Sequence, residues 1–294
     1  MFATDYLEKR LRYVAQRLTH FDLQTPDNTD EVSLVEMEEF LSESDRSSQL
    51  FLNFYTRAGL TNALEQYGTL ARLRSRGFQP EVSFRTMDKD KYLLHITDGE
   101  EGAVLIELVC RLGSLKAKAT QLTIPAGEII EVLAIEWLLL QNPQAQFTSQ
   151  HPRLPGQQFP GLGIGREVIT LLQIMTERLD REAMLAIPAH YHNSVLYNHH
   201  FHFFNPAKEA ELQTLLRDLA KLSLSEASWA VEQGLVIDQL TNKAFVWQPE
   251  EMIWPHSARL KDYFAAPEYQ QRVVDTCQQL SYRFTKNLAH PPQA

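Results

Sequence analysis

The chain has 294 residues, of which 44% are hydrophobic and 22% charged, so it is long enough for two compact domains with buried cores. Its formal net charge of −9 argues against nucleic acid as the main partner, because surfaces that bind nucleic acid are usually basic. The two cysteines, Cys110 and Cys277, are expected to be free thiols in a reducing compartment. No apolar run is long enough to span a membrane and the first residues lack the apolar core of a signal peptide, so we expect a cytoplasmic protein.

The first part of the chain, residues 1–78, is predicted to be a helical N-terminal region. Residues 4–19 carry apolar side chains on one face of a helical period and basic ones on the other. This pattern favours an ordinary domain helix, and a membrane-surface helix is the alternative that shares it. Further helices are predicted near residues 32–42 and 61–76.

Strand character begins near Gln79. The segments rich in Val, Ile, Leu, Tyr and Phe favour strands. With turn residues between the second and third segments, they predict an antiparallel meander. The predicted strands are 81–85, 91–97, 103–112 and 132–140.

The rest of the chain alternates helical and strand patterns. A helix is predicted over 167–179, a short strand over 184–190, a helix over 194–199 and a strand over 201–204. The C-terminal extension, 207–294, is predicted to be mixed and mainly helical. Its expected elements are helices at 208–222, 226–233 and 268–288, and a hairpin of 235–238 with 243–248.

A glycine segment, QQFPGLGIGREVITLL, occupies residues 157–172 and precedes the helical pattern at two-residue glycine spacing. A backbone without Cβ atoms can direct successive N–H groups at one point, and at a helix start such a nest holds phosphate. The segment matches neither the dinucleotide-binding fingerprint nor the Walker motif, because its glycine spacing and flanking residues differ from those that the motifs require. The competing interpretation is a tight turn followed by close helix packing.

Residues 81–204 resemble the GNAT acyltransferase superfamily in the order of their elements. That family has an antiparallel meander, a Q/R-x-x-G-x-G/A loop, a helix, a strand, a helix ending near a Tyr, and a final strand. Gln158-Phe159-Pro160-Gly161-Leu162-Gly163 matches the loop. A second register over Gly163-Ile164-Gly165 fits the helix start better and places Pro160 where Gln or Arg belongs, and both registers stay open.

The segment HNSVLYNHHFHFF is similar to a later part of the family pattern. Leu196-Tyr197 matches its Leu-Tyr pair, whereas Asn193 lies closer to the Tyr than usual. His200-Phe201 or Phe201-His202 stands where the family has Gly-Phe. The resemblance covers about 125 of the 294 residues.

The resemblance implies an α/β (α+β) fold, with a GNAT-like, mostly antiparallel sheet flanked by helices in a domain over 79–206. It implies acyl transfer from acetyl-CoA, as co-substrate, to an amine of a small molecule or protein. No nucleic acid or membrane partner is expected, and a homodimer is compatible with the sequence. The implied coenzyme-binding residues are Gln158, Gly161, Leu162, Gly163, Ile164, Gly165 and Arg166.

The chemistry implied by the resemblance requires a base, because an amine is protonated at neutral pH. Glu136 and Glu107 are acids in apolar strand patterns and are candidates, although each could simply face solvent. Tyr197 stands where the family keeps a general acid for the leaving thiolate, and packing in the core is its alternative. His192 or His190 could also act as the base, because neutral imidazole is available near physiological pH.

Histidines are concentrated between residues 190 and 202, where five of the ten occur. Several histidines close together are a signal for a metal site. If the segment formed strands, His190 and His192 would lie on the same face. No spaced metal motif is present, so no metal is expected, and a polar strand pair lining a cleft is the simpler interpretation. A metal-dependent enzyme using this cluster and a non-catalytic GNAT-like interaction protein are the alternatives. The sequence contains no G-x-S-x-G motif, so it gives no signal for the nucleophile of a serine-hydrolase triad.

Overall fold

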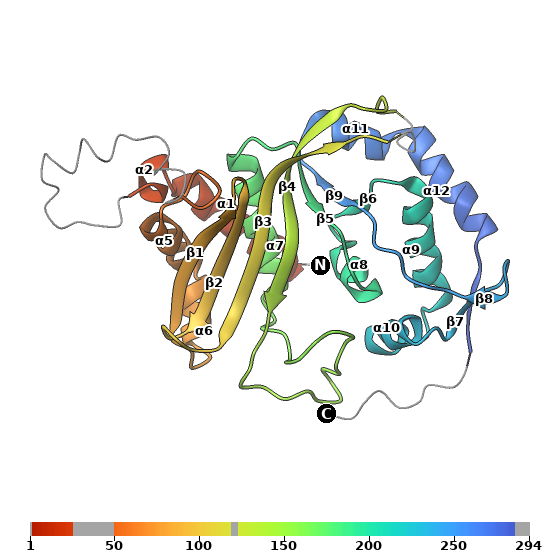
Figure 1. Ribbon diagram of the computed structural model, residues 1–294, viewed down its shortest axis with the longest axis horizontal. Helices are drawn as coiled ribbons and strands as arrows, with labels where there is room; N and C mark the ends of the chain where they lie inside the picture. Colours follow the sequence, from red (N-terminus) through yellow and green to blue (C-terminus); the bar gives the residue numbers. More distant parts are fainter. Residues whose placement is uncertain (1, 26–49, 119–122, 286–294) are drawn as a thin grey trace, which may run out of the picture. The chain divides into compact units, whose positions relative to one another are not determined.

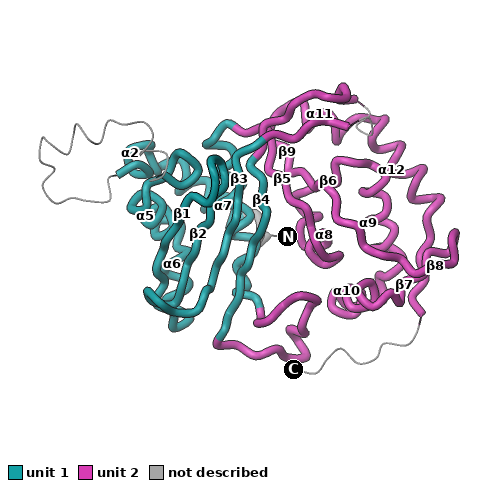
Figure 2. The backbone as a smooth tube through the Cα atoms, in the orientation of Figure 1, with its two compact units in different colours: residues 1–113, 133–143, 161–180 teal, residues 114–132, 144–160, 181–294 magenta. Residues whose placement is uncertain are grey.

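The structure is a computed structural model that describes residues 2–25, 50–118 and 123–285 (Figure 1). The helix predicted over 32–42 lies outside the described residues. The chain divides into two compact units (Figure 2). Unit 1 contains residues 1–113, 133–143 and 161–180, and unit 2 contains residues 114–132, 144–160 and 181–294. The predicted division at residues 78 and 206 stays a prediction.

A seven-stranded sheet has the order β1-β2-β3-β4-β5-β9-β6. Strand β1 pairs antiparallel with β2, and β2 with β3, which confirms the predicted mixed fold with a mostly antiparallel sheet. Strand β9 pairs antiparallel with both β5 and β6. The strands are β1 (Pro80–Asp88), β2 (Lys91–Asp98), β3 (Val104–Lys116), β4 (Ile129–Leu140), β5 (Ala183–Ala186), β6 (His202–Phe203) and β9 (Met252–Pro255).

The two faces of strands β1 to β3 differ because successive side chains in a strand point to opposite sides. On one face Phe84 and Tyr92 contact the ring of Phe51, with ring centroids 5.6 and 5.8 Å away, and form part of the core of unit 1. The other face carries polar residues, among them His95 and Glu107. Leu93, which is 6% exposed, lies on the same face as His95, so this face mixes polar side chains with a buried apolar one.

In Figure 1, α5 lies beside β1 and α7 lies beside β4, and both α5 and α6 contact β1. The segment predicted as one helix over 61–76 is two helices, because Gly68 between them has a left-handed φ of 83°. On the apolar side of α1, Leu11 is 0% exposed, and Arg12 is 2.8 Å from Glu177 of α7. The helices are α1 (Phe2–Arg17), α2 (His20–Leu23), α5 (Arg57–Tyr67), α6 (Thr69–Arg74) and α7 (Gly165–Arg178).

Unit 2 combines helices with a second, three-stranded sheet of order β10-β7-β8. The predicted hairpin is confirmed, because β7 pairs antiparallel with β8. The prediction of a helix over 268–288 is wrong in its last part, because α12 ends at Gln279 and the chain then forms β10. The elements are α8 (Tyr191–Tyr197), α9 (Pro206–Asp218), α10 (Leu224–Glu232), β7 (Val236–Asp238), β8 (Lys243–Ala244), α11 (Ala258–Ala265), α12 (Pro267–Gln279) and β10 (Tyr282–Phe284).

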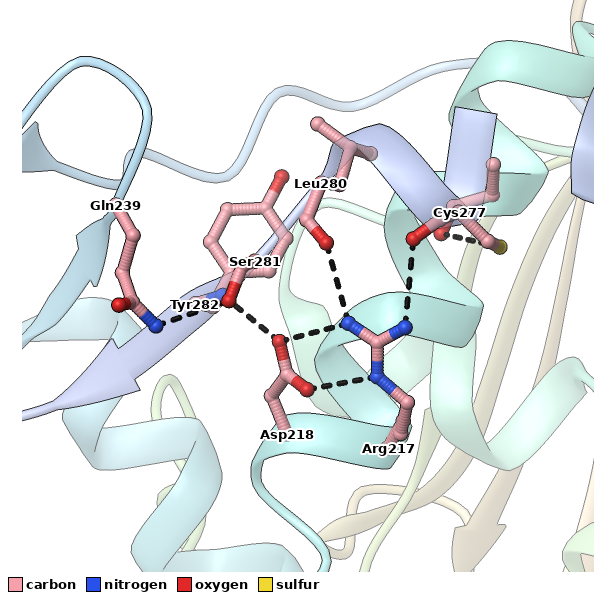
Figure 3. Close-up of polar contacts among 8 residues, drawn as sticks. Arg217, Asp218, Gln239, Cys277, Leu280, Ser281 and Tyr282 are labelled. Carbon is pink, nitrogen blue, oxygen red and sulfur yellow. Dashed lines mark hydrogen bonds and ion pairs between the residues drawn. The ribbon is translucent and has the colours of Figure 1, made fainter. Parts of the chain in front are cut away.

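The end of α12 is held to α9 by a polar clasp (Figure 3). Arg217 donates hydrogen bonds to the carbonyl oxygens of Cys277 and Leu280, at 3.3 and 3.1 Å. These carbonyls belong to the last turn of a helix, where backbone acceptors lack intrahelical donors. Asp218 pairs with Arg217 at 2.8 Å and accepts the backbone N–H of Tyr282 at 2.7 Å. The clasp therefore joins α9, α12 and β10.

Neither cysteine is in a disulfide, as expected from the sequence, and Cys110 is buried in β3. Burial, followed by the nearby charge of Glu136, raises the pKa of the Cys110 thiol. None of the described helices combines the length and apolar composition needed to cross a bilayer.

Candidate functional site

The glycine segment turns alternate residues inward and outward just before α7. Leu162 and Ile164 are each only 2% exposed, so their side chains anchor the segment in the core of unit 1. Gly161, before Leu162, and Gly163, between Leu162 and Ile164, are exposed. Gly163 has a φ of 63°, a left-handed conformation that L side chains rarely adopt. The apolar residues thus fix the backbone while the glycines leave it open to solvent.

Among the residues that the structure describes, several backbone donors of this segment have no hydrogen-bond partner. The first hydrogen bond of α7 runs from Val168 N–H to the carbonyl of Ile164 at 3.0 Å. In the described part of the chain, the N–H groups of residues 161–165 donate no hydrogen bond. Unpaired N–H groups and the positive end of the helix dipole favour an anion at such a position. The segment can therefore receive a phosphate group.

Arg76, from the connection between α6 and β1, lies beside these glycines. Its Nη1 donates a hydrogen bond to the carbonyl of Leu162. Its Nη2 is 3.9 Å from the point that a Cβ atom on Gly163 would occupy. Sequence reasoning missed this residue, because a separation of 86 positions leaves no local signal. A guanidinium next to unpaired N–H groups adds a positive charge suited to phosphate.

Glu167, in the first turn of α7, is a buried carboxylate with a fixed environment. It is 1% exposed and accepts a hydrogen bond from the hydroxyl of Thr69 at 2.7 Å. Arg72 lies 3.0 Å from its other oxygen, which balances the buried charge. These contacts tie α6 to α7, so the helix start and Arg76 belong to one packed region of unit 1.

The predicted coenzyme-binding residues do not all lie in one unit. Gly161, Leu162, Gly163, Ile164, Gly165 and Arg166 lie in unit 1, and Gln158 lies in unit 2. Arg166 is exposed at the second position of α7. The site in unit 1 is therefore built around residues 161–166 and Arg76, and both registers of the motif stay predictions.

Glu136, the first candidate base, is engaged by two cations. Its oxygens lie 2.8 Å from Arg111 Nε and 2.5 Å from Lys91 Nζ. Partial burial opposes ionisation, but the hydrogen bonds from Arg111 and Lys91 outweigh it and hold the pKa of Glu136 below its ordinary value. The carboxylate is therefore ionised and paired, whereas a general base for an amine benefits from a raised pKa.

Tyr197 and His192 both belong to α8, in unit 2. Burial raises the pKa of Tyr197, so its hydroxyl stays protonated at neutral pH, as a general acid must. His192 is 5% exposed, and burial followed by the nearby His190 lowers its pKa to about 4. Among the described residues its Nδ1 has no hydrogen-bond partner. The imidazole of His192 is therefore neutral at neutral pH. The catalytic roles of both residues stay predictions.

The prediction that His190 and His192 share a strand face is wrong. His190 precedes α8 as its N-cap residue, and His192 lies in the first turn of that helix. Their rings stack with centroids 5.3 Å apart, and His190 Nδ1 is 3.3 Å from Glu232. Within residues 2–25, 50–118 and 123–285, no group of three or more His, Cys, Asp or Glu side chains is placed to hold a metal ion.

Comparison with known proteins assigns this chain to no family. No protein-family model matches the chain, and no curated protein sequence matches it. The functional argument therefore rests on the residues and their geometry.

Proposed function

We propose that the chain transfers an acetyl or other acyl group from coenzyme A to an amine of a small molecule or protein. The observation that carries the proposal is the glycine segment, where buried Leu162 and Ile164 alternate with exposed Gly161 and Gly163 at the start of α7. Its unpaired N–H groups suit the pyrophosphate of the coenzyme. Arg76 adds a cation beside the same backbone.

The order of the elements supports the same proposal. The strands β1 to β4 are followed by the glycine segment, helix α7, strand β5, helix α8 and strand β6. Helix α8 ends at Tyr197, where the resemblance implies a general acid for the departing thiolate. A tyrosine that burial keeps protonated can supply that proton.

The proposal predicts that acetyl-CoA binds and raises the thermal midpoint of the protein, whereas adenosine does not. Arg76→Met should weaken acetyl-CoA binding about tenfold, because a charge-assisted contact to phosphate contributes roughly 1.4 kcal/mol. Arg74→Met is the matched control, since Arg74 is the last residue of α6, two positions before Arg76, but pairs with Glu65. Isothermal titration with the wild type and both variants measures the difference.

Gly163→Trp provides a second test, because its side chain would fill the space over the N–H groups of residues 161–165. The left-handed φ of 63° makes a side chain strained at this position, so circular dichroism must first show that the variant is folded. Acetyl-CoA binding should then be lost. Absence of any acetyl-CoA binding to the wild-type protein at millimolar concentration would overturn the proposed function.

A further inference from the structure

A histidine and a glutamate form a pair on the face of the unit 1 strands opposite to the one that carries Phe84 and Tyr92. His95 of β2 lies directly opposite Glu107 of β3 in the strand register. The His95 Nε2 atom is 2.7 Å from Glu107 Oε2, and the two side chains are 29% and 30% exposed. The pair belongs neither to the glycine segment nor to the ion pairs of Glu136. It joins an imidazole to a carboxylate where solvent can reach both.

The carboxylate determines which ring nitrogen of His95 carries the proton. An ionised carboxylate can only accept hydrogen bonds, so with neutral imidazole Nε2 must be the protonated nitrogen that donates to Glu107. Nδ1 is then left with its lone pair, and no hydrogen bond to it occurs within the described residues. A histidine held in one tautomer by an acid is the base and orienting partner of a nucleophilic site.

A serine completes the row on the other side of the histidine. Ser83 of β1 lies directly opposite His95, so Ser83, His95 and Glu107 stand side by side across three strands. Directly opposite residues point to the same face, with Cβ atoms about 4.5–5.5 Å apart. Ser83 is exposed, and its hydroxyl makes no hydrogen bond in the described part of the protein. Ser83 therefore lies next to His95 on the side of β1, and Glu107 lies next to His95 on the side of β3.

A cation stands next to this row. Arg85 is two residues after Ser83 on the same strand, so its side chain points to the same face. Arg85 is exposed and has no ion-pair partner among the residues that the structure describes. A guanidinium at this place can stabilise the negative oxygen that forms when a carbonyl is attacked. Nucleophile, base, orienting acid and cation therefore share one face of unit 1.

We propose that Ser83 is a nucleophile that accepts an acyl group from an activated ester or thioester, with His95 as its base and Glu107 as the positioning residue. The Ser83 oxygen attacks the carbonyl carbon while His95 Nδ1 takes the hydroxyl proton. The new O–C bond forms, and the bond from carbon to the departing oxygen or sulfur breaks with its electron pair on the leaving group. His95 then gives this proton to the leaving group and is a neutral base again. Water attacks the acyl-serine while His95 Nδ1 takes a proton from it, the bond from the carbonyl carbon to the Ser83 oxygen breaks, and His95 returns the proton to Ser83 as the free acid leaves.

The test uses p-nitrophenyl acetate as substrate and a fluorophosphonate as a covalent probe of the full chain. Peptide mass spectrometry should find the probe on Ser83, and acetate from the ester should appear on the same residue. Ser83→Ala should lose both modifications. His95→Gln should lower the rate of acylation by about 100-fold or more, the usual contribution of a general base.

Matched variants separate a catalytic role from a structural one. Ser114→Ala removes an exposed serine of β3 outside the row and should leave labelling of Ser83 unchanged. Glu107→Gln should abolish labelling, because an amide can donate to Nε2 and then leave the proton on Nδ1, whereas Glu107→Asp should retain part of it. Thermal midpoints confirm that each variant is folded. Labelling of Ser83 that persists unchanged in His95→Gln, or no labelling of Ser83 in the wild type, overturns the proposal.

Discussion

At the scale of single residues, the partners of a buried ionisable side chain decide its charge. Glu167 is buried with a hydroxyl and a guanidinium beside it, so a charge can stay in the interior. His192 is buried without a partner for Nδ1 among the described residues, so the neutral ring is favoured. Burial without a partner for Nδ1 therefore favours the neutral ring of His192, whereas Glu167 has a hydroxyl and a guanidinium at its oxygens.

The depressed pKa of His192 predicts a loss of stability in acid. Its pKa is about 4 in the folded chain against 6.5 ordinarily, so the unfolded state binds the proton first as the pH falls. The contribution of the neutral ring is complete above pH 6.5 and is lost toward pH 4. His192→Gln removes this dependence, which amounts to about 3 kcal/mol between those limits.

Urea unfolding at about pH 5 and about pH 7.5 measures this effect. The free energy of unfolding of the wild type should fall more than that of His192→Gln on going to the lower pH. His199→Gln removes an exposed histidine of the same region and is the control. Equal losses in the wild type and His192→Gln would contradict the assignment of a buried neutral ring.

At the scale of elements, helix ends carry much of the polar chemistry of this chain. Among the described residues, the N–H groups of residues 161–165, which lead into α7, donate no hydrogen bond, whereas the end of α12 has carbonyl groups that accept from Arg217. Both arrangements follow from the unpaired backbone groups that every helix leaves at its ends. An end with a protein partner is a structural contact, and an end without one can receive a ligand.

The clasp at the end of α12 predicts a local loss of stability in Arg217→Met. Arg217 is about half exposed, so solvent screening limits the expected cost to about 1 kcal/mol. Hydrogen exchange should accelerate at the end of α12 and in β10, with little change in unit 1. Arg272→Met, at an exposed position of α12, is the control. Exchange rates that are the same in both variants would show that the clasp does not hold the helix end.

At the scale of the whole molecule, the chain has two compact units and each contains fully buried apolar residues. Leu60 in unit 1 and Leu212 in unit 2 are both 0% exposed. Chains with more than one compact region commonly depart from two-state unfolding. The calorimetric enthalpy of unfolding should therefore exceed the van't Hoff enthalpy.

Core substitutions in each unit test this prediction by differential scanning calorimetry. Leu60→Ala and Leu212→Ala should each cost about 2–5 kcal/mol, and each should shift a different part of the transition. A single transition with equal enthalpies, moved as a whole by either substitution, would instead show that the two units unfold together.

Local patterns predicted much of the fold and one part of the candidate site. The meander and α7 follow from alternating and helical periods, and the glycine segment follows from the chemistry of glycine. Strand β9 was missed because its four residues carry too short a pattern, and α11 was missed as well. The strand assignment at His190 failed because a short apolar segment before a helix resembles a continuing strand.

The sequence by itself determined the meander, most of the longer helices and the place where glycines leave the backbone open, because periodicity and glycine act over a few residues. Only the tertiary structure decided that Arg76 meets the carbonyl of Leu162, 86 positions away. It also decided that the Glu136 carboxylate forms ion pairs with two cations and that Ser83, His95 and Glu107 lie side by side across three strands. The physical reason is that strand register and helix packing, rather than neighbouring residues, determine which distant side chains meet.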